Sequence, residues 1–312
     1  MENLILSLNV VLPLFFTMAL GYLLKRLKMF DDNTLRVMNN ITFKTFLPLL
    51  LFYNIYKTDL NGAINLKLIF FALTSVTLTF VILCIFIPLI EKNNQKRGVL
   101  IQGIFRSNFV IFGLPVACSL FGDDKVGVVA ILIATVVPLF NMLAVIALEI
   151  FRCGKLDIKN TLKGIITNPL IIASVIGLCF LALEIKLPTA IEKSVSDISR
   201  IATPLSLILL GGSFAFTDVK THLRQTVIGV TGRLIVIPGI LMPISIWLGF
   251  RDVELLGLML IFASPTAISS FTMAQKMDAD SDLAAQIVVF TSAFCILTVF
   301  LWIFLLKQFS LI

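Results

Sequence analysis

Charged residues are scarce in this sequence. Only 14% of its 312 residues are Asp, Glu, Lys or Arg, whereas 58% are hydrophobic, and the mean hydropathy is +1.03. A soluble globular chain is about one-quarter charged and about half apolar. The scarcity of charge excludes a soluble protein with a single anchor and indicates an integral membrane protein.

Residues that build metal and catalytic centres are also scarce. The chain has one histidine, His222, which by itself cannot form a histidine-rich metal site. The five cysteines lie apart in apolar segments without C-x-x-C spacing, and we interpret them as small buried hydrophobic residues. No HExxH, Walker A or G-x-S-x-G motif occurs. We therefore expect neither an enzyme nor a protein with a metal or organic cofactor.

Apolar runs long enough to cross a bilayer recur along the chain. A spanning helix needs about 20 residues, and the first run has neither the basic start nor the cleavage site of a secretory signal. Ten runs separate short polar loops, at residues 4–24, 35–56, 66–90, 98–120, 126–151, 164–184, 198–217, 223–249, 253–275 and 281–306. The sequence therefore predicts an all-α polytopic membrane protein with ten transmembrane helices, its longest polar interval lying around 186–197.

Acidic side chains are missing from the middle of all ten runs. Glu149 stands near the end of a run, and Asp123 and Asp124 fall between two runs. Sodium and proton antiporters usually need carboxylates inside the membrane as relays. A cation is therefore disfavoured as the main cargo.

Basic residues are distributed unevenly among the predicted loops. The odd-numbered loops hold 14 Lys and Arg, and the even-numbered loops with the carboxyl terminus hold 8. Because cytoplasmic loops are enriched in Lys and Arg, we expect the odd loops in the cytoplasm and both termini outside it. This bias accounts for the net charge of +7 better than nucleic-acid binding does.

Helix-perturbing residues recur at a fixed distance. Three of them in the first half of the chain reappear 156 residues later: Pro13, Gly21 and Pro48 as Pro169, Gly177 and Pro204. Pro115 is similarly followed by Pro265, 150 residues later. Five spans is an odd number, so the second copy enters the membrane from the opposite side. We therefore expect two inverted five-helix repeats, residues 1–156 and 157–312.

Two predicted spans, the fourth and the ninth, are interrupted by glycine or proline. The fourth contains R-S-N-F-V-I-F-G-L-P (106–115) and the ninth contains A-S-P-T-A (263–267). Paired interruptions in inverted repeats are a sequence pointer to a secondary transporter with its site near the membrane midplane. Two converging half-helix amino termini would favour an anion such as a carboxylate. The alternative is a pair of simple proline kinks.

Polar side chains near the two interruptions are candidate substrate-binding residues. Asn108 lies two helical turns before Pro115, so both would share one face of a regular helix, and its amide could bind a carboxylate or join two helices. Arg106 would point about 200° away from Asn108, either towards the cavity or out to the membrane interface. The other candidates are Gly113, Ser264, Pro265, Thr266 and Asn141.

Two more cations fall inside predicted spans. Lys44 and Arg233 have the same two interpretations as Arg106, a functional charge facing the interior or a side chain that reaches the interface. Lys44, four residues before Pro48, is the more central of the two in the predicted spans.

The sequence resembles the auxin efflux carrier family, bacterial relatives of the plant auxin exporters. The resemblance covers essentially the whole chain. Its most specific part is the N-x-x-x-x-G-x-P pattern of Asn108, Gly113 and Pro115. It also includes T-F-L-P-L-L-L-F (45–52), P-L-S-L-I-L-L-G-G-S-F (204–214) and the segment 264–294 that begins S-P-T-A.

The resemblance implies a ten-helix fold with crossed, discontinuous helices four and nine, similar to bile-acid/sodium symporters and sodium–proton antiporters. Helices 1, 2, 6 and 7 would form a scaffold, through which a homodimer could form, and helices 3–5 and 8–10 would form a moving transport domain. The resemblance also implies a substrate role for Asn108, crossover prolines at Pro115 and Pro265, and carboxylate cargo such as auxins, malate or malonate. The chain lacks the long loop that plant members carry between the halves, and it has no titratable acid in span three.

Three functions are compatible with these observations. The first is a secondary active transporter of small organic anions in a bacterial inner membrane, working by elevator-type alternating access. The second is a sodium-coupled organic anion symporter of the same fold, and the third is a membrane receptor that binds a carboxylate without moving it. Either a proton or sodium could serve as the coupling ion.

Overall fold

The computed structural model describes residues 2–57, 65–110, 116–117, 120–121, 127–152, 162–164, 166–214 and 221–312. In these ranges the chain forms helices joined by turns, with one isolated β-bridge and no strand. This agrees with the all-α membrane protein expected from the sequence. Two candidate residues, Gly113 and Pro115, lie outside the described ranges.

The described helices follow one another through the whole chain. They are α1 (Glu2–Arg26), α2 (Asp32–Ile41), η1 (Thr42–Phe46), α3 (Leu47–Tyr56), α4 (Leu66–Ile90), α5 (Asn94–Phe105), α7 (Gly127–Arg152), α9 (Pro169–Ala182), α10 (Thr189–Ser199), α11 (Ala202–Ser213), α12 (Leu223–Thr231), η4 (Gly232–Val236), α13 (Ile237–Trp247), α14 (Asp252–Ala263), α15 (Ser269–Lys276) and α16 (Ser281–Gln308). Four described segments are long and apolar enough to cross a bilayer: α4, α7, the run from α12 to α13, and α16.

Two helical runs change from α-helix to π-helix just before a proline. η1 joins α2 to α3 ahead of Pro48, and η4 joins α12 to α13 ahead of Pro238. In η1 the amide of Leu47 bonds to the carbonyl of Thr42, five residues earlier. Such a turn holds one extra residue, and π-turns are frequent at functional sites. Each run stays continuous but changes which side chains face its neighbours.

The polar interval around residues 186–197 is not an open loop. It forms α10, an amphipathic helix that packs against α3 and leads through Arg200 and Ile201 into α11. A helix that is apolar on one face only contains no fully apolar run, so hydropathy alone does not predict it.

Glycine residues permit close contact between α1 and α11. A Cβ atom at Gly21 would lie 2.0 Å from the carbonyl oxygen of Ile208, and one at Gly211 would lie 1.9 Å from that of Met18. Gly177 lies at the corresponding contact of α9 with α3, where a Cβ would be 3.1 Å from the Cβ of Ile55. Two of the repeated residues, Gly21 and Gly177, therefore lie at closely packed helix pairs.

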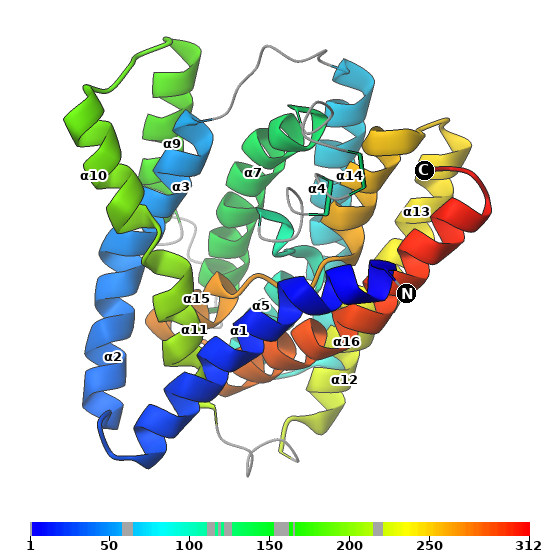
Figure 1. Ribbon diagram of the computed structural model, residues 1–312. Helices are drawn as coiled ribbons and strands as arrows, with labels where there is room; N and C mark the ends of the chain where they lie inside the picture. The colour runs from blue at the N-terminus through cyan, green and yellow to red at the C-terminus, as the bar shows by residue number, and fades with distance from the viewer. Residues whose placement is uncertain are drawn as a thin grey trace.

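The helices form two groups around a central layer (Figure 1). On the left α3 packs against α9 and α10, and on the right α16 packs against α12, while α5, α7 and α15 lie between. The ends of α5 and α14 that meet in this layer are buried on all sides, over residues 98–105 and 255–263. The broken spans are therefore the core of the molecule.

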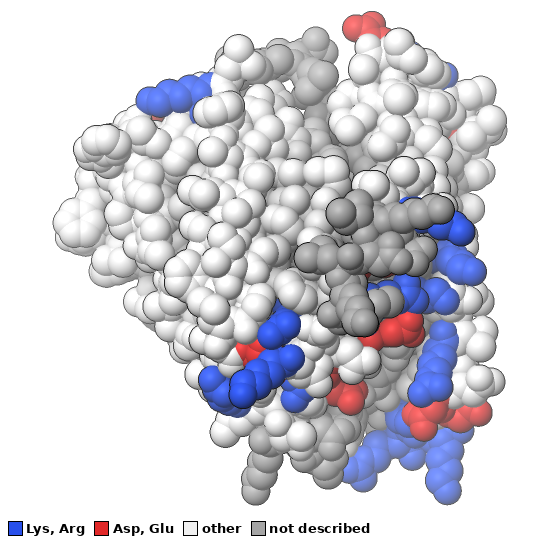
Figure 2. Space-filling model, turned by 180° about the vertical axis from the view of Figure 1, so that it is seen from behind, with Lys and Arg blue, Asp and Glu red and all other residues white. Residues whose placement is uncertain are grey.

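The outer surface is apolar over a wide area. Figure 2 shows a broad region without charged side chains, with most visible Lys and Arg gathered towards the lower and right edges. Large apolar side chains are exposed here and there on the outside, for example Phe16, Leu89 and Trp247, which are 71%, 76% and 83% exposed. Such a surface fits contact with lipid chains.

Candidate functional site at the crossing of two chain breaks

Two helices break at the same place in the core. α5 ends at Phe105 because Arg106 is extended, with φ −91° and ψ 119°. α14 ends at Ala263 because Ser264 is extended, with φ −66° and ψ 154°. The chain becomes helical again at residue 109 and at α15.

The two extended segments pair with each other as an antiparallel bridge. Ser107 lies opposite Thr266. The amide of Asn108 donates to the carbonyl of Pro265 at 2.7 Å, and the amide of Ala267 donates to the carbonyl of Arg106 at 3.4 Å. Within a membrane every backbone polar group needs a partner inside the protein, and here each break supplies partners for the other.

The expected regular helix through residues 106–108 was wrong. In an extended segment residues two apart lie on the same side, whereas a helix would have turned Arg106 and Asn108 apart. Both line one cavity, and Ser107 between them also contributes to its lining. The segment that faces Pro265 at the crossing is 106–108, and Pro115 lies outside the described residues.

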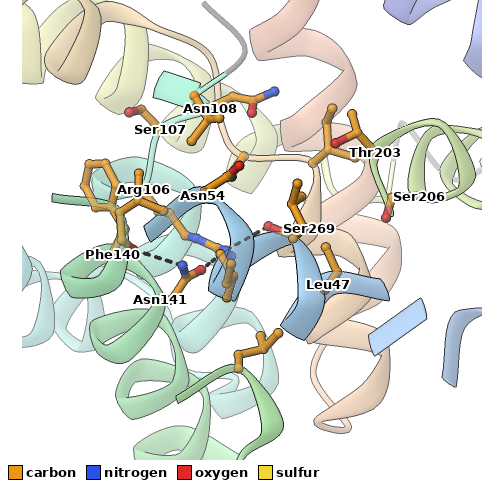
Figure 3. Close-up of a pocket in the computed structure, with 17 residues that line it drawn as sticks. Leu47, Asn54, Arg106, Ser107, Asn108, Phe140, Asn141, Thr203, Ser206 and Ser269 are labelled. Carbon is orange, nitrogen blue, oxygen red and sulfur yellow. Dashed lines mark hydrogen bonds between the residues drawn. The ribbon is translucent and has the colours of Figure 1, made fainter. Parts of the chain in front are cut away.

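The cavity lies between the crossing and helices α3, α9 and α11. One wall carries side chains of α3, α9 and α11, and the other carries side chains of the two broken spans and α7, as the close-up shows (Figure 3). Its polar lining residues are Asn54, Arg106, Ser107, Asn108, Asn141, Thr203, Ser206 and Ser269. None of the described residues that line it is Asp or Glu.

Arg106 is a buried cation held by neutral groups. Its side chain is 4% exposed. One terminal nitrogen, Nη2, donates to the amide oxygen of Asn141 and to the hydroxyl of Ser269, the second at 2.7 Å, as the dashed lines in Figure 3 show. The other, Nη1, contacts the sulfur of Met273 at 2.9 Å and the hydroxyl of Ser270 at 3.4 Å. Arg106 therefore does not extend to the membrane interface.

The positive charge of Arg106 has no acidic partner among the described residues. Its hydroxyl partners, Ser269 and Ser270, are in the first turn of α15, where the helix dipole adds partial positive charge. Desolvating a cation without a counter-charge is costly. The cavity is therefore electropositive and suited to an anion.

Asn141 has both of its amide groups engaged. Its oxygen accepts from Arg106, and its nitrogen donates to the carbonyl of Val137 at 2.9 Å, one turn earlier in α7. The side chain is 2% exposed. Asn141 thus fixes the position of the guanidinium and lines the cavity.

Asn108 presents a free donor at the cavity. Its side chain is 8% exposed, and its Nδ2 atom has no acceptor within the described parts of the chain. The hydroxyls of Ser107 and Ser206, which also line the cavity, are likewise buried without a described partner. Because buried polar groups are nearly always hydrogen-bonded, these three groups indicate a place for a polar ligand or water.

Ser264, Pro265 and Thr266 lie at the crossing but are not among the cavity-lining residues. The hydroxyl of Thr266 donates to the carbonyl of Gly103 at 2.7 Å, and its amide donates to the hydroxyl of Thr291 at 3.1 Å. The hydroxyl of Ser264 is buried without a described partner. In the second break it is Ala267, Ile268 and Ser269 that reach the cavity.

Lys44 and Arg233, the other two cations in the predicted spans, lie in different surroundings. Lys44 is exposed, whereas Arg233 is 1% exposed and donates to main-chain carbonyls of both α5 and α14. The sequence carried an indirect signal for such a residue, because Pro265 cannot donate to the carbonyl four residues before it. The cavity residues Asn54, Thr203 and Ser206 were also missed, since each stands alone in an apolar run.

Comparison with known proteins gives the family of this chain. The family model described as "Membrane transport protein" matches residues 6–163 and 155–303. The chain belongs to this family, the auxin efflux carriers.

Three relatives match this chain over nearly their whole length. An uncharacterized transporter of Methanocaldococcus jannaschii is 23% identical over 309 residues, which cover 95% of this chain and 98% of the relative. An uncharacterized transporter of Methanothermobacter thermautotrophicus is 24% identical, with 95% and 97% covered. A Rhizobium meliloti protein with the name "Putative malonate transporter" is 23% identical, with 96% of each chain covered. The protein is therefore a membrane transporter by family.

Proposed function

We propose that this protein is a secondary transporter of small organic anions, and that Arg106 and Asn108 bind the carboxylate in the cavity at the crossing. The observation that carries the proposal is the buried guanidinium of Arg106, which has only neutral partners among the described residues. A carboxylate in the cavity would supply the missing counter-charge to the guanidinium. The free Nδ2 donor of Asn108 provides a second contact.

Two observations support the predicted inverted repeats. The first predicted span packs on the seventh (α1 on α11), and the sixth packs on the second (α9 on α3), which is the pairing that a pseudo-twofold axis would generate. The cavity is also lined by two pairs of residues 156 apart, Leu47 with Thr203 and Leu50 with Ser206. We therefore retain residues 1–156 and 157–312 as the two repeats.

Alternating access is proposed to move the cavity's two walls relative to each other. One wall comes from α3, α9 and α11 of the predicted scaffold, and the other comes from the crossing and α7 of the predicted transport domain. Because the crossing is tied by main-chain bonds from both breaks, we expect it to move as one rigid body. This is an elevator-type mechanism in which α3 and α11 form the fixed side.

Malonate is the first cargo to test, because one relative carries that activity in its name. The purified protein would be reconstituted into sealed vesicles and the uptake of labelled malonate measured. Arg106→Met should abolish uptake, because Arg106 is the one cation among the described residues that line the cavity. Lys44→Met is the matched control, because it removes an exposed cation from a helical run. This variant should retain uptake.

Two outcomes would contradict the proposal. Full uptake by Arg106→Met would reject the assigned site. Binding of malonate or another carboxylate without any flux into the vesicles would indicate a receptor rather than a transporter.

A further inference from the structure

Each break leaves carbonyl groups without their usual amide partners. In a continuous helix the carbonyl of Ile261 would bond to the amide of residue 265, but Pro265 has no N–H. The carbonyl of Ile104 would bond to the amide of Asn108, which instead donates to Pro265. These groups lie deep in the protein, where an unpaired carbonyl is costly.

Arg233 supplies the missing donors for both breaks. Its Nη2 atom donates to the carbonyl of Ile261 at 2.6 Å, and its Nε atom donates to that of Ser264 at 2.7 Å. Its Nη1 atom donates to the carbonyls of Ile104 and Phe105, both at 3.1 Å. One guanidinium thus joins the last turn of α5 to the last turn of α14.

The oxygen atoms of these four carbonyls together could coordinate a cation. The carboxyl ends of two helices meet here, and each carries partial negative charge. In transporters with broken helices, carbonyls at half-helix ends are the groups that coordinate a coupling cation. In this chain the position is filled by a side chain, and no described acid pairs with it.

We propose that Arg233 is a resident cation that takes the place of a coupling metal cation at the crossing. The inference rests on the proposed transport function, because it concerns how transport is coupled. A guanidinium suits the position because its donors form a rigid planar fork and it stays protonated. As a consequence, sodium need not bind at this position for the crossing to hold its shape.

The local fold brings Arg233 to this position. It is the second residue of the π-turn η4, whose extra residue alters the direction of the side chains. The preceding Gly232 lies against α5, where a Cβ atom would be 3.1 Å from the Cδ1 of Ile104. Glycine therefore allows η4 to lie close enough for the guanidinium to reach both helix ends.

The test measures thermal unfolding of the purified protein in sodium, potassium and N-methylglucamine chloride. The wild-type melting temperature should be the same in all three salts. Arg233→Ala should melt about 10 °C lower, and added methylguanidinium or sodium should restore part of the loss by occupying the vacated carbonyl site. A purely structural arginine would lower the melting temperature without creating this dependence on cations.

Controls and a second variant keep the result decisive. Lys44→Met, which removes an exposed cation, should show no cation dependence. Arg233→Lys keeps a charge but cannot reach all four carbonyls, so it should melt between the wild type and Arg233→Ala, with a smaller response to added cations. If neither Arg233 variant folds, the wild-type comparison in the three salts still tests the inference.

Three results would overturn the proposal that Arg233 is a resident cation. One is a sodium-specific rise in the wild-type melting temperature. The others are an Arg233→Ala protein that is as stable as wild type and an Arg233→Ala protein that no cation stabilises. None of these measurements needs a transported substrate. Failure of malonate uptake would therefore reject the proposed function without affecting the thermal result, and sodium-dependent stability would reject the resident cation alone.

Discussion

The guanidinium of Arg106 and the amide oxygen of Asn141 are hydrogen-bonded at the wall of the cavity. The cation is therefore positioned by a neutral acceptor, which leaves its charge available to a ligand. A carboxylate at position 141 would do the same positioning but would also neutralise the charge.

Asn141→Asp should consequently separate stability from transport. The new ion pair with Arg106 should raise the melting temperature, because the desolvated cation gains a counter-charge. Anion uptake should fall about tenfold or more, because the substrate must compete with a built-in carboxylate. Melting curves and vesicle uptake on the same preparation check both effects, and Asn141→Ala, which should lower both quantities, is the control. A stabilised variant with normal uptake would contradict the anion site.

Asn108 variants should lose transport in a defined order. Asn108→Ala removes one donor and should raise the KM for malonate several-fold, whereas Asn108→Asp adds a negative charge beside the cavity and should nearly abolish uptake. The side chains of Asn and Asp have almost the same size, so a loss of uptake in Asn108→Asp would come from the added charge and not from a steric effect. Initial uptake rates over a range of malonate concentrations measure this order, and equal rates for Ala and Asp would remove Asn108 from the site.

Thr266 should matter for stability more than for binding. Thr266→Val keeps the side-chain shape but leaves the carbonyl of Gly103 without its 2.7 Å donor, at a cost of about 1–3 kcal/mol. Thr231→Val is the control, because the hydroxyl of Thr231 donates to the carbonyl of Val227 within its own helix. Thermal unfolding should separate the two variants, while the KM for malonate stays near the wild-type value in both. A raised KM in Thr266→Val would instead show that the hydroxyl acts on the substrate.

Gly211→Ala tests the close packing of α1 on α11. The added methyl would lie 1.9 Å from the carbonyl oxygen of Met18, so the helices must separate, and we expect a loss of about 1–3 kcal/mol. Gly239→Ala is the matched control, since nothing lies within 4 Å of its added Cβ, and it should be neutral or slightly stabilising. Equal melting temperatures for the two variants would show that the helix pair tolerates separation.

Local sequence signals predicted an all-α membrane protein but not the place where α5 breaks. Arg106, Ser107 and Asn108 have no glycine or proline among them, and they are extended because a segment about 160 residues later bonds to them. That pairing is a long-range interaction, which propensity and hydrophobic periodicity do not report. The second break was predicted at its observed place, because Pro265 marks it directly in the sequence.

The candidate site was also predicted only in part, because some of its contacts are between distant segments. Asn108, Arg106 and Asn141 were named from their polarity in apolar runs, and all three line the cavity. The importance of Arg233 could not be predicted from its own span, because its partners are carbonyls freed in two other helices. Polarity identifies which residues are unusual, and the contacts between distant helices decide what each one does.

The two buried guanidiniums set the electrical character of the proposed carrier. With Arg106 and Arg233 both buried, and no described acid paired with either, the interior of the proposed moving part carries two unpaired positive charges, among its described residues, when it is empty. A monocarboxylate would leave one of them and a dicarboxylate would leave none. Because each charge that crosses the bilayer is worth about 2.3 kcal/mol per 100 mV, the membrane voltage would act mainly on the empty carrier when the cargo is a dianion such as malonate.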